Sequence, residues 1–258
     1  MASRPIRLAL EDGSEVPWLT FIVCFPKPSG RELQRRLQQL LELGVTELIL
    51  DGPQNIDHFK VLGKGCDSII VKALAKNIVV ALKIRRTDSH VRTLAIEGEN
   101  QKLANSVGVG AKVYGFSDDF IVMDIVNGLH IDSFVEKASN YDAKRVVIDL
   151  LKQCRRLDLL HLDHGELSRA HRHVMVTPDL KPVIIDFGSS SRVRKPSNVS
   201  SIFNFLFLSK RKLSALLLEK LGVSLIEDEA IKMLREYKRG LSEELFTKLL
   251  SMVSLGET

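Results

Sequence analysis

The sequence predicts an α+β protein in which strands dominate the first part of the chain and helices the second. Short apolar runs of strand length recur first, and leucine-rich stretches with helical periodicity follow them. At 258 residues the chain can bury a substantial core, as one large domain or as two lobes. Its apolar and charged fractions are those of an ordinary folded protein.

Composition excludes several classes of protein. The longest apolar run, Ile202 to Leu208, is far too short to span a bilayer. The first residues include Asp and Glu and do not resemble a signal peptide, so we expect a cytoplasmic protein with no membrane partner. Cys24, Cys66 and Cys154 are odd in number and widely spaced, which argues against a disulfide framework or a zinc site.

The first 55 residues are predicted to form a small β-α-β extension. Leu19 to Cys24 is an apolar, β-rich run, and Glu47 to Leu50 is a second predicted strand. Between them, Ser29 and Glu32 form a capping-box signature, and Gly44 ends the helix. Four leucines are expected on one face of that helix: Leu33, Leu37, Leu40 and Leu41. We identify no chemistry in this extension.

A glycine-rich loop follows, with Gly63, Lys64, Gly65 and Ser68 in the form G-x-G-x-x-S between two strand-like runs. Glycines let backbone amides approach phosphate oxygens without a Cβ in the way. The same pattern is also a common hairpin turn.

Lys83 lies in the middle of the apolar strand Val80 to Ile84. Burying a lysine there without a partner is costly, so it requires phosphate oxygens, a carboxylate or both; a snorkelling edge-strand lysine is the alternative. The next helix, predicted from His90 to Ser106, contains Glu97 and Glu99. We predict that Glu97 binds Lys83, because its position leaves a complete helix and a turn before the strand at 112–114.

The second part of the chain begins after the strand Phe120 to Asp124. A predicted central helix, Asp142 to Leu160, leads into the polar loop from His161 to Val176. Clustered His, Arg and carboxylate side chains between a helix and a short strand favour a site over a core. The apolar residues Val183 to Ile185 form a predicted buried strand, and Asp186-Phe187-Gly188 follows it. A carboxylate at the end of such a strand can hold a metal, although Asp-Phe-Gly also occurs as an ordinary turn at the end of a strand.

The net charge of +5 is unevenly distributed. No acidic residue occurs from Phe187 to Lys212, which makes this stretch a candidate polyanion patch or a solvated basic face. It contains Arg192, Arg194, Lys195, Lys210, Arg211 and Lys212. Predicted helices follow at Val199 to Leu221, Asp228 to Tyr237 and Leu241 to Val253. We interpret their leucine-rich faces as packing surfaces.

The chain resembles the protein-kinase-like superfamily from about Phe59 to Arg194. The resemblance is carried by the order of its motifs, which is G-x-G-x-x-S, V-A-L-K, Glu97, a hinge, H-G-E-L and D-F-G. The chain is similar to the atypical archaeal branch near the RIO kinases and the small kinase of the KEOPS complex. It shares with that branch the H-G-E-L form, the small size and the absence of an A-P-E segment. Within that branch the chain resembles the predicted archaeal Ser/Thr kinases, which include the archaeal RNA kinase that phosphorylates a tRNA ribose 2′-hydroxyl. The resemblance implies a bilobal kinase-like fold, with an antiparallel β N-lobe over 56–126 and a mainly helical C-lobe over 127–258.

The resemblance also implies roles for single residues. Gly63, Lys64, Gly65 and Ser68 would cover the triphosphate of ATP, and Lys83, held by Glu97, would bind its α and β oxygens. Asp186 would bind Mg²⁺. Backbone groups near Asp124 and Val126 would contact the adenine, and Met123 would line its pocket or belong to the core.

Two departures from the family pattern concern catalysis. Glu166 stands where the family places the aspartate that orients the acceptor hydroxyl, with Asp163 as a second candidate. The family's metal-binding Asn corresponds to His171 or, as we favour, His173. Histidine is a poor ligand for Mg²⁺, so the site would use one metal, or a second one through water.

Three functions remain open from the sequence. The first is transfer of phosphate from ATP to a tRNA ribose hydroxyl, which the basic stretch favours. Its candidate RNA contacts are Arg169, Arg172, Arg192, Arg194 and Lys195. The second is a Ser/Thr protein kinase, and the third is a nucleotide-binding pseudokinase. The sequence does not predict an oligomeric state.

Overall fold

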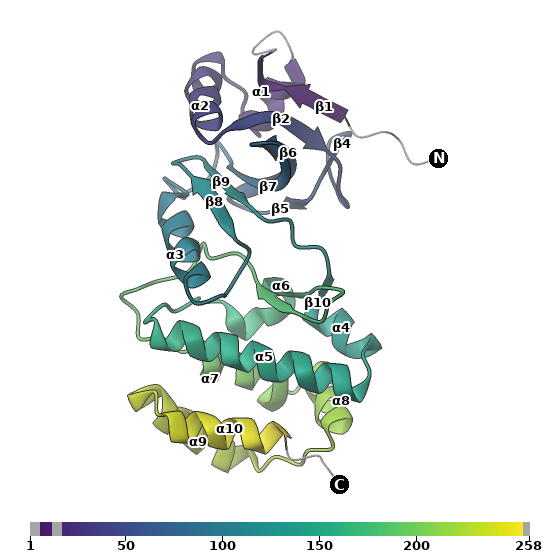
Figure 1. The fold of residues 1–258 in the computed structure, drawn as a ribbon, viewed down its shortest axis with the longest axis vertical. Helices are drawn as coiled ribbons and strands as arrows, with labels where there is room; N and C mark the ends of the chain where they lie inside the picture. Colours follow the sequence, from purple (N-terminus) through teal and green to yellow (C-terminus); the bar gives the residue numbers. More distant parts are fainter. Residues whose placement is uncertain (1–5, 12–16, 255–258) are drawn as a thin grey trace. The chain divides into compact units, whose positions relative to one another are not determined.

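The computed structural model describes residues 6–11 and 17–254. The chain forms two compact units. Unit 1 extends up to Lys102 and also includes Lys112–Ile125, whereas unit 2 comprises Leu103–Ala111 and the chain from Val126 onward. The protein is therefore α+β, with an antiparallel sheet in unit 1 and mostly helices in unit 2 (Figure 1). Among the described residues, no helix is long and apolar enough to cross a membrane.

Unit 1 is built on an antiparallel sheet with the strand order β1-β2-β6-β7-β9-β8, and β5 pairs with β6. A separate hairpin, β3–β4, precedes β5. The bounds of these strands are β1 Ile6–Ala9, β2 Val45–Leu50, β3 Gln54–Ile56, β4 Phe59–Val61, β5 Gly63–Lys64, β6 Ser68–Ala75, β7 Ile78–Arg85, β8 Val113–Phe116 and β9 Phe120–Met123. The segment before residue 56 thus contributes strands β1 and β2 to the same sheet as the strands that follow it.

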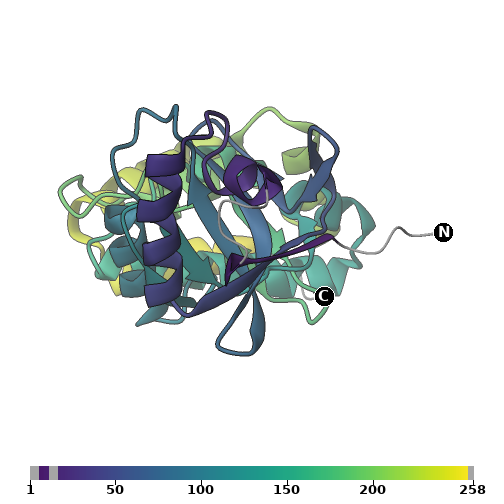
Figure 2. The same ribbon diagram turned by 90° about the horizontal axis from the view of Figure 1, so that it is seen from above.

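Helices α1 (Pro17–Val23) and α2 (Gly30–Glu42) lie over one face of this sheet (Figures 1 and 2). The predicted strand from Leu19 to Cys24 was therefore wrong. Its buried residues Leu19, Ile22 and Val23 have the i, i+3, i+4 spacing of a helix face, and this spacing prevails over β propensity.

Helix α2 forms as predicted, and Gly44 follows its end in the left-handed region at φ +75°. Two details of the prediction were wrong. Ser29 is the N-cap but its side chain makes no capping hydrogen bond, because Glu32 binds Arg35 and Arg36 instead. Leu41 is 57% exposed, and the helix buries the guanidinium of Arg36 instead.

Helix α3 (Ala95–Asn105) lies near β8 and β9, where a Cβ on Gly98 would come within 2.4 Å of the Phe116 ring. Glycine at this position is therefore a packing requirement. The helix begins five residues later than predicted, because the hydroxyl of Thr93 accepts a hydrogen bond from the amide of Ala95 at 3.0 Å and caps the first turn.

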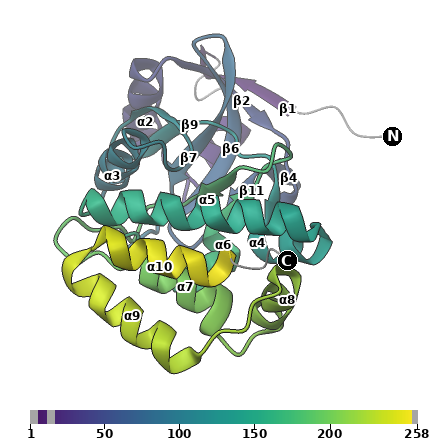
Figure 3. The same cartoon turned by 60° about the horizontal axis from the view of Figure 1, so that its bottom comes forward.

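Unit 2 is centred on α5 (Asn140–Leu159), which packs against α7, α8 and α10 (Figure 3). A three-stranded sheet in the order β10-β11-β12 lies at one side of it. The other bounds are β10 Leu129–His130, α4 Ile131–Lys137, the 3₁₀ helix η2 Leu167–Arg169, α6 Ala170–His173, β11 Val174–Val176, β12 Pro182–Ile184, α7 Asn198–Phe203, the π-helix η3 Asn204–Leu208, α8 Lys212–Leu221, α9 Glu227–Gly240 and α10 Glu243–Ser254.

The predicted helix from Val199 to Leu221 is interrupted after η3. The hydroxyl of Ser209 donates to the carbonyl of Phe205 at 2.8 Å and ends the helical path, and α8 begins at Lys212. The last two predicted helices are confirmed as α9 and α10.

Candidate functional site

The glycine-rich segment forms the hairpin between β5 and β6, where the amide of Gly65 donates to the carbonyl of Ser68 at 2.8 Å. A Cβ on Gly63 or Gly65 would meet its nearest neighbour at 3.6 or 3.5 Å, which is ordinary contact. At Gly52, by contrast, a Cβ would lie 2.1 Å from a backbone oxygen. The packing of unit 1 therefore requires glycine at position 52 but not at 63 or 65.

The other residues of this loop are placed differently from one another. Ser68 is buried, whereas Lys64 is exposed with its Nζ 5.6 Å from the centre of the Phe25 ring. Arg86, which the sequence analysis missed, donates to the carbonyl of Gly65 at 3.0 Å and fixes the tip of the hairpin.

Lys83 and Glu97 form a buried ion pair, as predicted from the sequence. The distance from Lys83 Nζ to Glu97 Oε1 is 2.5 Å, and the side chains are 8% and 7% exposed. The neighbours of Lys83 in β7, Leu82 and Ile84, belong to the core beneath α1 and α2, so strand alternation directs Lys83 to the other face. Glu99 is exposed, and Glu97 is the buried glutamate of α3.

At the predicted hinge, the amide of Asp124 donates to the carbonyl of Lys112 at 2.9 Å and is thereby occupied. Its carboxylate accepts a hydrogen bond from the hydroxyl of Tyr114 at 2.5 Å, and this bond raises the pKa of Tyr114. Met123 is partly buried, and its sulfur lies 3.5 Å from Gln101 Nε2. Val126 is the residue at which the chain enters unit 2.

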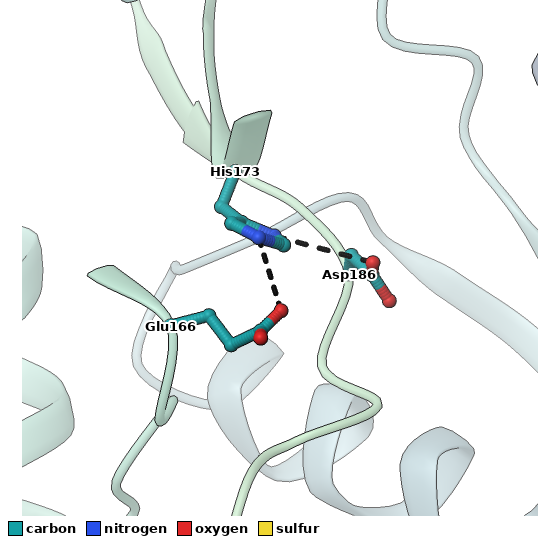
Figure 4. Close-up of side chains that lie close together, drawn as sticks. All are labelled: Glu166, His173 and Asp186. Atoms are coloured by element: carbon teal, nitrogen blue, oxygen red, sulfur yellow. Dashed lines mark ion pairs between the residues drawn. The ribbon is translucent and has the colours of Figure 1, made fainter. Parts of the chain in front are cut away.

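In unit 2 the structure brings together Glu166, His173 and Asp186 (Figure 4). One potential ligand atom from each residue lies within 4.8 Å of the others. His173 Nε2 is 3.0 Å from Glu166 Oε2, and His173 Nδ1 is 4.0 Å from Asp186 Oδ2. Glu166 precedes η2, His173 ends α6, and Asp186 follows β12. We call these three residues the Glu166 cluster.

His164, the first residue of the H-G-E-L motif, packs against this cluster, and the sequence assigned it no role. Its ring lies 5.0 Å from that of Phe187 and 5.6 Å from that of His173, and its Nε2 is 3.2 Å from the carbonyl of Ile185. Burial, with a smaller effect from His173, lowers the pKa of His164 to about 4. The imidazole is therefore neutral at pH 7 and holds the backbone next to Asp186.

Asp186 itself has a left-handed backbone, with φ +66°. Only glycine, asparagine and aspartate adopt this region at low cost, and such strain concentrates at functional sites. Phe187 is completely buried, whereas the side chain of Asp186 is 50% exposed. The turn thus anchors the phenyl ring in the core and presents the carboxylate to solvent.

Asp163, the second candidate for the catalytic base, has a structural role. It is 5% exposed; one carboxylate oxygen accepts from Arg194 Nε at 2.9 Å, and the other accepts from the amide of Ser197 at 3.0 Å. Glu166 is more accessible, with 22% of its side chain exposed. It is paired with Arg169 through one oxygen and with His173 through the other.

The cations of the predicted basic stretch are exposed, and several of them also contact other parts of the protein. Arg194 is committed to Asp163 and to the carbonyl of Ser189, and Lys195 donates to the carbonyl of Arg239 at 3.3 Å. Contacts with other elements also hold Arg211, which lies over the ring of Phe205, and Lys212, which pairs with Glu136. Arg172 and Arg192 are exposed.

His171, the alternative to His173, lies outside the Glu166 cluster. Its ring stacks on Phe205 with a centroid distance of 6.0 Å, and its Nδ1 is 3.5 Å from Arg211 Nη1. The structure therefore favours His173 as a possible metal ligand. Asp186 supplies carboxylate oxygen and His173 supplies imidazole nitrogen, a donor set that suits a divalent cation.

No known family model matches this chain. The chain is similar to an uncharacterized protein, MJ1211, of Methanocaldococcus jannaschii, with 28% identity over 117 residues. The similarity covers 45% of this chain and 96% of that relative. This distant likeness assigns no family, so the function has to be argued from the geometry of the residues described above.

Proposed function

We propose that this protein is an ATP-dependent phosphotransferase that acts on a hydroxyl group. The observation that carries the proposal is the buried Lys83–Glu97 pair, with 2.5 Å between Nζ and Oε1. Removing two charges from water costs several kcal/mol per ion, and apolar residues of similar volume often stabilise a fold at least as well. A buried pair on the sheet is therefore better explained by a lysine held ready for an anionic ligand.

The glycine hairpin supports the same reading. Because the protein's own packing tolerates a Cβ at Gly63 and Gly65, their identity is best explained by a ligand that approaches the backbone closely. Phosphate oxygens are such ligands, since backbone amides bind them without a side chain in the way.

In the proposed reaction, the acceptor hydroxyl oxygen attacks the γ-phosphorus of ATP. The bond to the β–γ bridging oxygen breaks, and ADP leaves with the electron pair. Glu166 accepts the hydroxyl proton, and Lys83 neutralises charge on the α and β phosphates. A divalent cation bound by Asp186 would supply electrostatic stabilisation of the triphosphate.

For the acceptor, we propose a tRNA ribose 2′-hydroxyl. The exposed Arg172 lies one residue before His173, and the exposed Arg192 follows the turn that contains Asp186. Guanidinium groups at these positions are suited to the phosphates of a nucleic acid. Arg194 pairs with Asp163, and its side chain is 52% exposed, so it stays a candidate for an RNA contact.

The test incubates the full chain with γ-labelled ATP, bulk tRNA and a generic protein substrate. Label in tRNA supports the proposal, whereas label in protein only would replace the RNA acceptor with a protein hydroxyl. We expect Asp186→Asn to reduce transfer at least about 10³-fold, while Asp179→Asn, a change in the exposed β11–β12 turn, leaves it unchanged.

A matched pair of lysine variants tests the nucleotide assignment separately. Lys72 on the adjacent strand β6 also pairs with a carboxylate, Asp51, at 2.5 Å, but this pair is more exposed. We expect Lys83→Met to weaken ATP binding at least about tenfold and Lys72→Met to leave it unchanged. Equal effects of the two changes would remove the basis of the proposal.

A second candidate, nucleotide binding without transfer, is favoured by one observation. Both carboxylate oxygens of Glu166 already have a partner, Arg169 on one and His173 on the other, so neither is free to accept the proton of an acceptor hydroxyl. ATP binding with no label transfer to any acceptor would select this candidate.

A further inference from the structure

His173 has one ring nitrogen with a partner and one without. Its side chain is 7% exposed, and Nε2 lies 3.0 Å from Glu166 Oε2. Nδ1 is buried and makes no hydrogen bond with any described residue. Leaving a buried polar atom unpaired costs about 1–3 kcal/mol, so an unpaired nitrogen at this position calls for an explanation.

The contact with Glu166 also decides which nitrogen is the donor. A carboxylate accepts hydrogen bonds, so in the neutral imidazole the proton is on Nε2 and the lone pair is on Nδ1. Figure 4 shows the ring between the two carboxylates, with the Nδ1 side toward Asp186. In the neutral imidazole, a buried lone pair on Nδ1 that accepts no hydrogen bond thus faces the half-exposed carboxylate of Asp186.

The spacing of these atoms fits a single bridging ion. His173 Nδ1 and Asp186 Oδ2 are 4.0 Å apart. Metal bonds to imidazole nitrogen and carboxylate oxygen are each about 2.0–2.2 Å long, so two such bonds span at most about 4.4 Å. Glu166 would then hold the far side of the imidazole, which is the carboxylate–histidine–metal arrangement that raises the basicity of a histidine ligand.

From this arrangement we infer that His173 Nδ1 and Asp186 form a mixed nitrogen–oxygen site that selects a first-row transition-metal dication over Mg²⁺. Imidazole suits transition metals, whereas Mg²⁺ binds oxygen almost exclusively. Glu166 acts in this site as a positioning residue that fixes the tautomer of His173. That the bound ion also accompanies ATP rests on the proposed function, but the selectivity of the ion site does not.

The simpler alternative is that Asp186 alone binds Mg²⁺ and that His173 only orients Glu166. The two readings differ in whether nitrogen enters the coordination sphere of the metal. They also differ in the outcome of His173→Asn, which places an amide oxygen at the position of Nδ1 and so replaces the nitrogen donor with an oxygen donor.

The test uses the full chain, stripped with a chelator and free of nucleotide, with Mn²⁺ as the probe. Electron paramagnetic resonance measures Mn²⁺ binding, and its pulsed form detects coupling to a coordinated histidine nitrogen. We expect nitrogen coupling in the wild type and at least tenfold tighter binding of Mn²⁺ than of Mg²⁺ in competition. His173→Asn should abolish the coupling and bring the two affinities within about threefold of each other.

His171→Asn is the matched control, because His171 lies two residues away and contacts Phe205 instead. It should retain both the coupling and the selectivity. The inference is overturned if the wild type shows no nitrogen coupling, binds Mg²⁺ as tightly as Mn²⁺ or binds neither ion. Because no nucleotide is present, Mn²⁺ selectivity without phosphate transfer would contradict the proposed function alone, and transfer without nitrogen coupling would contradict this inference alone.

Discussion

Two groups of charged side chains, one in each unit, differ in how completely their polar atoms are satisfied. In unit 1, the carboxylate of Asp119 is fully buried and binds three arginine side chains together with one glutamine: Arg35, Arg36, Arg85 and Gln39. In unit 2, the Glu166 cluster contains a buried nitrogen, His173 Nδ1, that makes no hydrogen bond. It also contains Asp186, which has a half-exposed carboxylate and a left-handed backbone.

This difference separates a structural role from a chemical one. Burial alone would raise the pKa of Asp119, but the guanidinium groups of Arg36 and Arg85 outweigh it, and the net pKa is lowered. Arg36 also donates to the carbonyls of Val23 and Arg85, which ties α2 to α1 and to the sheet. A buried charge that is held by several partners stabilises the fold, whereas backbone strain and solvent exposure are features of a site that binds a ligand.

The largest expected effect on stability comes from removing the carboxylate of Asp119. Asp119→Ala leaves Arg36 buried without its carboxylate and should lower the free energy of unfolding by about 3–5 kcal/mol, measured by urea denaturation. Asp186→Ala should change it by less than about 1 kcal/mol, because that side chain is half-exposed. Similar losses for the two variants would erase the distinction between the groups.

A second effect is the response of unit 2 to acid. His164 has a pKa of about 4 in the folded state and 6.5 in the unfolded chain. Between pH 4 and pH 6.5, the unfolded chain therefore binds more protons than the folded protein. Stability should therefore be complete above about pH 6.5 and fall by about 3 kcal/mol as the pH approaches 4. Urea denaturation of His164→Asn across this range should show a shallower pH dependence; an unchanged one would exclude His164 as the source.

The backbone strain at Asp186 should be visible as a smaller effect. Replacing a non-glycine residue that has positive φ with glycine removes a steric cost, so Asp186→Gly should stabilise the protein by about 0.5–1 kcal/mol while abolishing metal binding. His161, which is exposed and has φ +54°, provides the control. His161→Gly should give a similar gain in thermal stability with metal binding intact, and destabilisation by Asp186→Gly would show that the turn is not strained.

The smallest expected effect is that of Arg169→Ala. Arg169 is largely exposed, so removing its ion pair with Glu166 should cost no more than about 1 kcal/mol of unfolding free energy. Its consequence for chemistry is in the opposite direction, because Arg169 no longer occupies one carboxylate oxygen of Glu166. Label transfer per enzyme should therefore rise or stay constant at saturating ATP, unless Arg169 itself binds the acceptor, in which case transfer falls.

The sequence predicted the local motifs better than their surroundings. Lys83 and Glu97 could be paired in advance because an apolar strand with one lysine and a helix with few glutamates leave few combinations. Asp119 and Arg36 were missed, because a single arginine on a helix and an aspartate in a turn have the pattern of solvated residues. Their burial depends on contacts between elements distant in sequence, which no local pattern encodes.

Contacts between distant elements explain the other differences. Arg194 lies in a basic stretch, and its ion pair with Asp163 was not predicted from the local pattern. Likewise, Leu19–Cys24 has strand propensity, and α1 forms there because its apolar residues complete the core above the sheet. The preference for His173 over His171, made from the sequence, agrees with the structure, in which two residues of separation in α6 direct the two rings to different neighbours.

The path of the chain has a consequence for dissecting this protein. Because the backbone passes between the units at Lys102–Leu103, Ala111–Lys112 and Ile125–Val126, neither unit is one continuous segment. Only a protease cut at Ala111–Lys112 removes a piece from both units. A cut at Ile125–Val126 keeps all of unit 1 in one product but removes 103–111 from unit 2, and a cut at Lys102–Leu103 keeps all of unit 2 but removes 112–125 from unit 1. Expression of unit 1 without any residue of unit 2 would require a short linker that joins Lys102 to Lys112.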